Sequence, residues 1–257
     1  DVLGTQHTSQ PASFQPREIF SGAEAAGVWG GAVNYQVDAK DIKEGLPDLP
    51  KAKGGKTESY MSIEETKRRP LSLPVPGQGY PSEFEIKNRL TVNVHTVKDI
   101  SVLLSHIKRK RYPYHLIAAR PFTEQSFQRC CDSEMLDIIS IDISQRLEYR
   151  PKLSFLQKAQ KKGISFEICY APAIRDPTLR RNTIGNAAEL IRLLRGRNII
   201  LTSGAGHSFE LRGPHDVINL GIIFGLKEKN AHQSITSIPK SIMDRASTNS
   251  PDEFKME

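Results

Sequence analysis

The chain has 257 residues, enough to bury one sizeable core or two small ones. Hydrophobic residues make up 38% and charged residues 25%, as in a soluble globular protein with some disordered length, and no apolar run approaches the roughly 20 residues of a membrane span. The net charge of +7 predicts an acidic partner, for which RNA, DNA and anionic membrane are the usual candidates, although solvated lysine-rich faces give the same balance.

Short apolar segments alternate with helical patterns along most of the chain. A very short segment at Val2-Leu3 is compatible with a further strand at the start. The predicted strands are Trp29–Val37, Leu90–His95, His115–Pro121, Asp137–Ser144, Ser165–Ala171 and Asn198–Ser203. The predicted helices are Val97–Lys110, Thr123–Cys131, Pro151–Lys162, Pro177–Arg195, Pro214–Phe224 and Glu228–Arg245.

Strand–helix repetition at intervals of roughly 25–30 residues predicts right-handed βαβ units and a parallel sheet. Such units close into a barrel or remain open as a doubly wound sheet, and the periodicity fits both. We predict a single α/β domain over residues 1–246, followed by a disordered tail at 247–257. The segment Asp38–Pro81 is rich in Gly, Pro and Lys, and it is predicted to be a long insertion, either ordered against a partner or a disordered loop.

The stretch Ser165–Ala188 is the most informative part of the sequence. Phe166, Ile168 and Tyr170 alternate with Glu167 and Cys169, which predicts a buried strand. Asp176-Pro177 then supplies an N-cap and a proline for the first position of a helix. The helix is predicted to bury one apolar face, made of Ile184, Ala187, Ala188, Ile191 and Leu194.

Arg175, Arg180 and Arg181 crowd this strand-to-helix junction. In strand–helix architectures such junctions are where sites are usually built. Guanidinium forks suit bidentate contacts with phosphate, so the triplet predicts RNA contact; the alternative is an arginine–carboxylate network that braces the mouth of the sheet. Arg212 could join the same basic surface or cap a neighbouring strand.

A second basic run, Lys108-Arg109-Lys110-Arg111, ends a predicted helix beside Tyr112 and Tyr114. Cations at a helix C-terminus are favourable on dipole grounds, but four in succession exceed that need, and tyrosines stack on unpaired bases. We predict contact with RNA or another acidic partner here. The lysines around Pro151–Lys162 do not all share a face and are more typical of a solvated surface. 

Two arrangements could carry other chemistry. His95, Asp142 and Glu167 lie at or near separate strand ends and could converge on a metal, as a barrel phosphoesterase requires, although the rest of a first shell is missing. The turn Ser203–Ser208, SGAGHS, could cradle phosphate with backbone N–H groups, or it could be a tight turn that needs glycine.

The three cysteines have no zinc-ligand spacing and favour a reducing intracellular compartment. The stripe Val217, Leu220 and Phe224, with Gly221 among it, is predicted to be core, or alternatively a surface for a protein partner.

Several separated segments together resemble one known family. FEICYAPAIRDPTLRRNTIGNA, followed by RNIILTSGAGHSFELRGPHDVINLGIIFGL, is similar to the thirty-kilodalton protein subunit shared by ribonuclease P and ribonuclease MRP. WGGAVNYQV resembles the second strand of that family, and RLTVNVH, YHLIAARPFTEQSFQRCC and DIISIDIS resemble the middle of its barrel.

The resemblance implies an irregular TIM-like barrel with about seven parallel strands, akin to phosphoesterase domains of the polymerase-and-histidinol-phosphatase type. It implies a nuclear and nucleolar ribonucleoprotein subunit that supports 5′-end maturation of precursor tRNA and processing of precursor rRNA. The RNA subunit would carry the catalytic metals, so no catalytic residue and no cofactor are expected in this chain. The expected partners are that RNA, a small α/β protein subunit and other subunits, with precursor tRNA contacted indirectly and no membrane. The RNA-contact residues that we predict are Arg175, Arg180, Arg181, Lys108, Arg109, Lys110, Arg111, His207 and Arg212. A stand-alone metal-dependent barrel phosphoesterase and a purely protein-binding scaffold are the alternatives.

Overall fold

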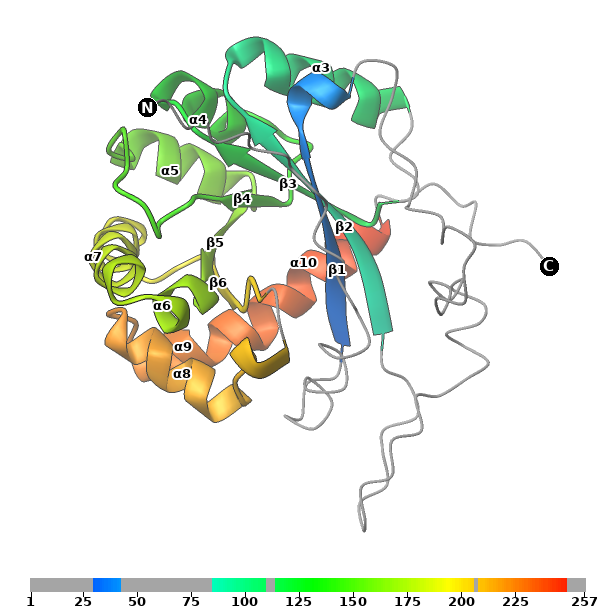
Figure 1. Ribbon diagram of the computed structural model, residues 1–257. Coiled ribbons are helices and arrows are strands. Elements are labelled where there is room, and N and C mark those ends of the chain that lie inside the picture. Colours follow the sequence, from blue (N-terminus) through cyan, green and yellow to red (C-terminus); the bar gives the residue numbers. More distant parts are fainter. Residues whose placement is uncertain (1–29, 43–84, 110–113, 206–207, 249–257) are drawn as a thin grey trace, which may run out of the picture.

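Six parallel strands form the centre of the computed structural model, which describes residues 30–42, 85–109, 114–205 and 208–248 (Figure 1). The strands are β1 (Gly30–Asp38), β2 (Glu85–Val94), β3 (Leu116–Pro121), β4 (Ile138–Ser140), β5 (Ser165–Cys169) and β6 (Ile199–Thr202). The helices are α3 (Val97–Arg109), α4 (Glu124–Cys131), α5 (Leu153–Lys161), α6 (Ala171–Arg175), α7 (Pro177–Leu194), α8 (Pro214–Ile223), α9 (Glu228–Ile235) and α10 (Ser237–Thr248), with 3-10 turns η1 (Ala39–Asp41) and η2 (Ser208–Glu210). None of these helices is long and apolar enough to cross a membrane.

The order of the strands decides how the sheet is wound. Neighbouring strands follow one another in sequence, β1-β2-β3-β4-β5-β6, and every pair is parallel. A doubly wound sheet would reverse its order at a switch point, whereas a TIM-like barrel winds in one direction. The fold is therefore α/β with barrel-type winding, as predicted. In the described part of the chain the sheet ends at β1 and β6, and Val2-Leu3, the segment expected to add a strand, lies outside the described residues.

The sheet also curls, because side chains from distant strands meet on its inner face. Arg89 of β2 bonds Glu167 of β5 with both arms of its guanidinium, one of them at 2.6 Å. Three strand spacings separate these positions by about 14 Å in a flat sheet, too far for side chains that stand upright on it. Only a sheet that curves toward its inner face brings them together.

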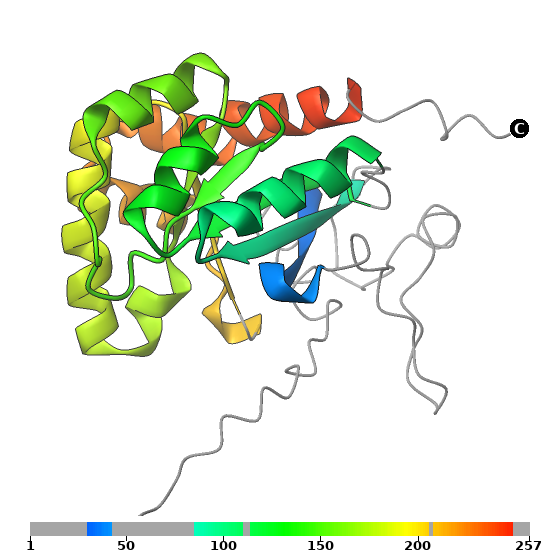
Figure 2. The same ribbon diagram turned by 90° about the horizontal axis from the view of Figure 1, so that it is seen from above.

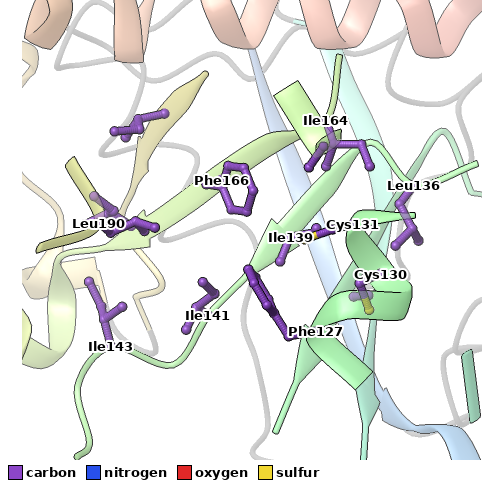
Figure 3. Close-up of a cluster of buried hydrophobic side chains, with 14 of the residues drawn as sticks. Phe127, Cys130, Cys131, Leu136, Ile139, Ile141, Ile143, Ile164, Phe166 and Leu190 are labelled. Atoms are coloured by element: carbon purple, nitrogen blue, oxygen red, sulfur yellow. The ribbon is translucent and has the colours of Figure 1, made fainter. Parts of the chain in front are cut away.

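The outer face of the sheet carries the larger apolar core. Helices α3, α4, α5 and α7 follow one another around this face, and side chains of α4, β4, β5 and α7 meet in it (Figures 1 and 3). Phe166 and Ile168 point into it, whereas Glu167 points to the inner face, which confirms the predicted alternation of β5. Burial of such a core is the main favourable contribution to folding.

The inner face is apolar at one end and polar at the other. Helix α10 crosses this face and packs Ile242 and Ala246 against Leu116, Ile138 and Ile200 (Figure 2). Its Arg245 Nη1 donates at 2.6 Å to the carbonyl of Gly163, which lies two residues before β5. Helix α10 therefore closes the amino end of the curved sheet and leaves the polar inner face toward the carboxyl ends of the strands.

Local signals explain most of the helix boundaries. Thr123 and Ser126 form a reciprocal capping box at the start of α4. The Oδ1 atom of Asp176 accepts from the backbone N–H groups of Thr178 at 2.7 Å and Leu179 at 2.9 Å, which confirms the predicted cap of α7. Because these N–H groups stabilise the carboxylate, the pKa of Asp176 is lowered.

Several boundaries and faces differ from the prediction. A continuous helix over Glu228–Arg245 is wrong: the chain breaks at Thr236, whose φ of −121° and ψ of −86° are not helical. On α7, Ala188 is exposed and Leu190 takes a place in the core, so the buried face is rotated from the predicted one. At the start of the expected insertion Asp38–Pro81, Ala39 and Ile42 are buried in the core; residues 43–84 lie outside the described part.

Candidate nucleic-acid interface

The carboxyl ends of β5 and β6 meet at the start of α6 and set the frame of the candidate site. The N–H of Tyr170 donates to Thr202 O at 3.0 Å, and that of Ala171 donates to Ser203 O at 2.9 Å. Helix α6, which the sequence prediction missed, follows directly and ends at Arg175. Arg175 therefore ends α6, and Arg180 and Arg181 lie near the start of α7, with Asp176 between the two helices.

Arg175 is engaged by the protein itself. Its Nε and Nη2 atoms donate to the two carboxylate oxygens of Glu210 in η2, the second at 2.7 Å, and Nη2 also donates to Gly204 O at 3.2 Å. The hydrogen bonding to Glu210 and the negative charge of that carboxylate both raise the pKa of Arg175. This is the bracing network that the sequence left as the alternative for Arg175, and it fixes the turn after β6 against α6.

The other predicted arginines at the carboxyl end of the sheet differ in how many hydrogen bonds they form with the rest of the protein. Arg180 Nε donates to Ala173 O at 2.7 Å. Arg212 Nη1 donates to Phe209 O at 2.8 Å and to Leu211 O at 2.7 Å, and its backbone N–H donates to the Tyr170 hydroxyl at 3.1 Å. Arg181 is exposed and forms no ion pair or hydrogen bond with other described residues.

A further arginine, missed by the sequence reasoning, belongs to the same surface. Asn186 Nδ2 of α7 donates to Ile143 O at 2.9 Å and to Gln145 O at 2.8 Å, which holds the segment after β4 against α7. Arg146 follows Gln145 directly and is exposed. The signal available in the sequence was its position just after a predicted strand, where parallel sheets place their sites.

The remaining predicted contacts are not brought to this surface. Lys108 and Arg109 end α3, whose C-terminus precedes β3 and so lies at the amino end of the sheet, away from Arg181. Lys108 is exposed, whereas the Arg109 side chain is not described. Lys110, Arg111 and His207 lie outside the described residues. We define the carboxyl-end basic surface as Arg146, Arg175, Arg180, Arg181 and Arg212.

The turn after β6 is a tight turn in its described part. Gly204 has a φ of +57°, and a Cβ at this position would lie 2.9 Å from the Cβ of Cys169. Its carbonyl already accepts from Arg175. Glycine at position 204 is therefore required by the backbone conformation and the close approach to β5, as the tight-turn interpretation predicted.

The inner face of the sheet carries a polar network centred on Glu167. Burial alone would raise the pKa of Glu167, but the Arg89 guanidinium and the Thr202 hydroxyl, which donates at 2.9 Å, lower it to about 2. Arg89 Nε also donates to Thr91 Oγ1 at 3.1 Å, and this hydroxyl donates to Asn34 Oδ1 at 2.6 Å. Glu167 thus carries a full charge that Arg89 neutralises.

His95, Asp142 and Glu167 do not converge as the metal hypothesis required. His95 stacks on Phe122, with ring centroids 4.4 Å apart, and Asp142 Oδ1 accepts from Ser144 Oγ at 2.6 Å. Glu167 is occupied by Arg89. In the ranges that the structure describes, no group of three or more His, Cys, Asp or Glu side chains is placed to hold a metal ion. What this end of the sheet offers is a braced set of guanidinium groups.

The stripe on α8 packs as core. Val217 and Phe224 are buried, and a Cβ at Gly221 would lie 2.7 Å from Leu201 Cδ1, so the absence of a side chain allows α8 to approach β6. The isoleucines at the end of the helix point elsewhere: Ile222 is 43% and Ile223 60% exposed.

Comparisons with known proteins agree with this architecture. The family model described as RNase P subunit p30 matches residues 7–250. The mouse (Mus musculus) ribonuclease P protein subunit p30 is 35% identical over 206 residues, which cover 80% of this chain and 71% of that protein. The probable ribonuclease P protein subunit 3 of Schizosaccharomyces pombe is 34% identical over 179 residues, 69% of this chain and 74% of that protein.

A solved structure shares the fold. A chain in the cryo-EM structure of archaeal ribonuclease P with mature tRNA aligns with a TM-score of 0.55 at 13% identity, over 68% of this chain and 76% of that one. The match of the family model extends over most of the sequence, including the braced junction and the core stripe of α8. This chain belongs to the RNase P subunit p30 family.

Proposed function

We propose that this chain acts as a protein subunit of the ribonuclease P and ribonuclease MRP ribonucleoproteins, in the nucleus and nucleolus. There it supports 5′-end maturation of precursor tRNA and processing of precursor rRNA. The family match over residues 7–250 is the observation that carries the proposal. In this role the RNA subunit supplies the catalytic metals, and the chain contributes RNA contacts and contacts with other protein subunits.

The RNA contact that we assign is the carboxyl-end basic surface. Arg146, Arg180 and Arg181 are exposed, and their planar guanidinium groups fit phosphate oxygens as bidentate donors. Asp176 already occupies the first free N–H groups of α7, so the side chains rather than the helix N-terminus would hold the phosphate. Arg175 serves this surface as a brace, since Glu210 and Gly204 use its donors.

Affinity purification of the full chain, followed by RNA sequencing and mass spectrometry, tests the proposed class. The expected result is one abundant structured noncoding RNA, or two, together with several protein subunits. Recovery of protein partners without an enriched RNA would contradict the assignment and favour a protein scaffold. Microscopy of the tagged chain checks the proposed nuclear and nucleolar location.

The double variant Arg180→Ala/Arg181→Ala tests the site. Each phosphate contact that is lost should lower the slope of log affinity against log salt by about 1, so the variant should bind the recovered RNA more weakly and with a slope lower by about 2. Arg192→Ala is the matched control, because this exposed arginine of α7 is already paired with Glu189 at 2.8 Å. Equal affinity and slope for the double variant and the control would remove the site assignment.

A protein contact is assigned to the exposed end of α8. Ile222 and Ile223 are adjacent, and both remain accessible while Val217, Ile218 and Gly221 of the same helix are buried. They suit the apolar contact that a small α/β subunit would need. The variant Ile223→Asp should release a protein subunit from the purified particle, and an unchanged subunit composition would move this contact elsewhere.

A further inference from the structure

A second group of cations lies at the opposite, amino end of the sheet. It comprises residues from three neighbouring turns, which we call the amino-end basic surface: Lys161, Lys162, Arg195, Arg197, Lys227 and Lys229. All six are exposed. Lys161 and Lys162 end α5 just before β5, Arg195 and Arg197 lie between α7 and β6, and Lys227 and Lys229 open α9.

Contacts between these turns show that they adjoin one another. Gln160, next to Lys161, donates through Nε2 to Leu194 O and Arg197 O, each at 3.3 Å, which joins the α5 turn to the α7 turn. A Cβ at Gly196 would collide with Asn230, so α9 packs directly on the turn that carries Arg195 and Arg197. The six cations therefore share one region of the surface.

Most of these cations lack an internal partner. Lys162 donates to the carbonyl of Asp132, but the other five form no ion pair with any carboxylate in the described ranges. The carboxylates at this end are fewer: Asp132 is paired with Lys158 at 3.3 Å, while Glu134 and Glu228 are exposed. Arg175, by contrast, forms an ion pair with Glu210. Crowded cations without counter-charges favour an anionic partner.

The backbone beneath Arg195 adds a second, independent observation. Arg195 occupies the position after α7 where the chain turns left-handed, with φ 54°, and the N–H of Gly196 bonds Ile191 O at 2.9 Å to complete the cap. Glycine is the residue that adopts this conformation without strain. An arginine here costs stability, so its long cationic side chain is better explained by a contact outside the fold.

We propose that the amino-end basic surface is a second phosphate-binding surface for RNA, so that the chain joins two RNA segments across its two ends. This inference rests on the proposed function, which makes RNA the anionic partner. No aromatic side chain occurs in the three turns at 161–164, 195–198 and 225–229, so the surface has charge but no stacking platform. It therefore suits contact with the sugar-phosphate backbone rather than with bases.

The variant Arg195→Gly separates binding from folding. Relief of the left-handed strain should leave the melting temperature unchanged or raise it by about 2–4 °C, while RNA affinity falls. The triple variant Lys161→Gln/Arg195→Gly/Arg197→Gln should lower the salt slope by about 3. Lys152→Gln is the matched control, since that exposed lysine is paired with Glu124 at 2.6 Å.

Footprinting on the RNA that copurifies with the full chain completes the test. The triple variant should lose protection at one RNA segment, and Arg180→Ala/Arg181→Ala should lose it at another. If wild-type chain recovers no RNA, the proposed function itself fails. If wild type binds RNA and the triple variant keeps its affinity, slope and footprint, the second surface is overturned while the proposed function stands. Binding to phosphatidylserine-containing vesicles that the triple variant loses, with RNA binding intact, would also overturn it.

Discussion

Two arginine–glutamate pairs in this protein are both bidentate but differ in how far the arginine is exposed. Arg89–Glu167 is buried on the inner face of the sheet, with side chains 9% and 3% exposed, and it joins β2 to β5. Arg175–Glu210 lies at the carboxyl end of the sheet, with the arginine side chain 42% exposed, and it joins α6 to η2. In the first pair each buried charge is neutralised by the other. In the second pair water also screens the charge of the arginine. The comparison predicts that the inner pair governs stability and the outer pair governs the position of the turn after β6.

Breaking the inner pair should have the largest effect. Arg89→Met leaves the Glu167 carboxylate buried without its counter-charge, and the free energy of unfolding should fall by about 3–5 kcal/mol. The double variant Arg89→Met/Glu167→Leu should recover most of that loss, because two apolar side chains remove the unpaired charge. Urea unfolding measures both. If Arg89→Met and wild type have the same free energy of unfolding, the stability of the fold does not depend on the Arg89–Glu167 pair.

Acid should weaken the inner pair selectively. The pKa of Glu167 is about 2 in the folded chain, against 4.5 for a free glutamate, so the unfolded state takes up the proton first. Its contribution is complete above pH 4.5 and is lost as the pH falls toward 2, a loss of about 3 kcal/mol. Unfolding measured over this pH range checks the slope. Arg89→Met/Glu167→Leu should lack this component, and an identical profile in that variant would assign the acid sensitivity to other groups.

Breaking the outer pair should cost less and act locally. Glu210→Gln keeps the shape of the side chain but removes the charge that holds Arg175, and we expect a loss of about 1–2 kcal/mol. Amide exchange should rise at Ser203–Ala205 and Glu210–Arg212 while the core strands stay protected. Glu189→Gln is the control, since its pair with Arg192 is exposed and should contribute less than about 0.5 kcal/mol. Uniform loss of protection across the sheet would contradict a local role.

Replacing an arginine that forms no ion pair with the described residues should have the smallest effect on stability. Arg181 is exposed without a partner among the described residues, so Arg181→Ala should change the free energy of unfolding by less than about 0.5 kcal/mol. RNA binding should nevertheless weaken, with a salt slope lower by about 1. A stability loss comparable with that of Glu210→Gln would show that Arg181 has a structural role instead.

Much of the architecture follows from local patterns. The period of two in β5, the cap at Asp176 and the proline at 177 act over a few residues, so they predicted the strand and the start of α7. The face of α7 was less accurate, with Ala188 exposed and Leu190 buried, because neighbouring elements decide which side of a helix they cover. The break at Thr236 was missed because the apolar pattern continues across it.

The site was predictable in composition but not in arrangement. The arginines at 175, 180 and 181 were identified from their place between a strand and a helix. That Arg175 is held by Glu210, 35 residues away, depends on how the turn after β6 returns to α6. The run Lys108–Arg111 and the junction arginines were predicted as one kind of contact, yet α3 ends at the amino end of the sheet and α7 begins at the carboxyl end.

The sequence by itself determined the family, the alternation of strands and helices, and the charge available for an acidic partner. Those properties depend on residue identity and on short-range spacing. The tertiary structure alone decided the winding of the sheet, the meeting of Arg89 with Glu167 across three strands, and which cations remain free. The physical reason is that pairing between distant residues depends on the curvature of the sheet and on which end each connection reaches, and neither is encoded in a local pattern.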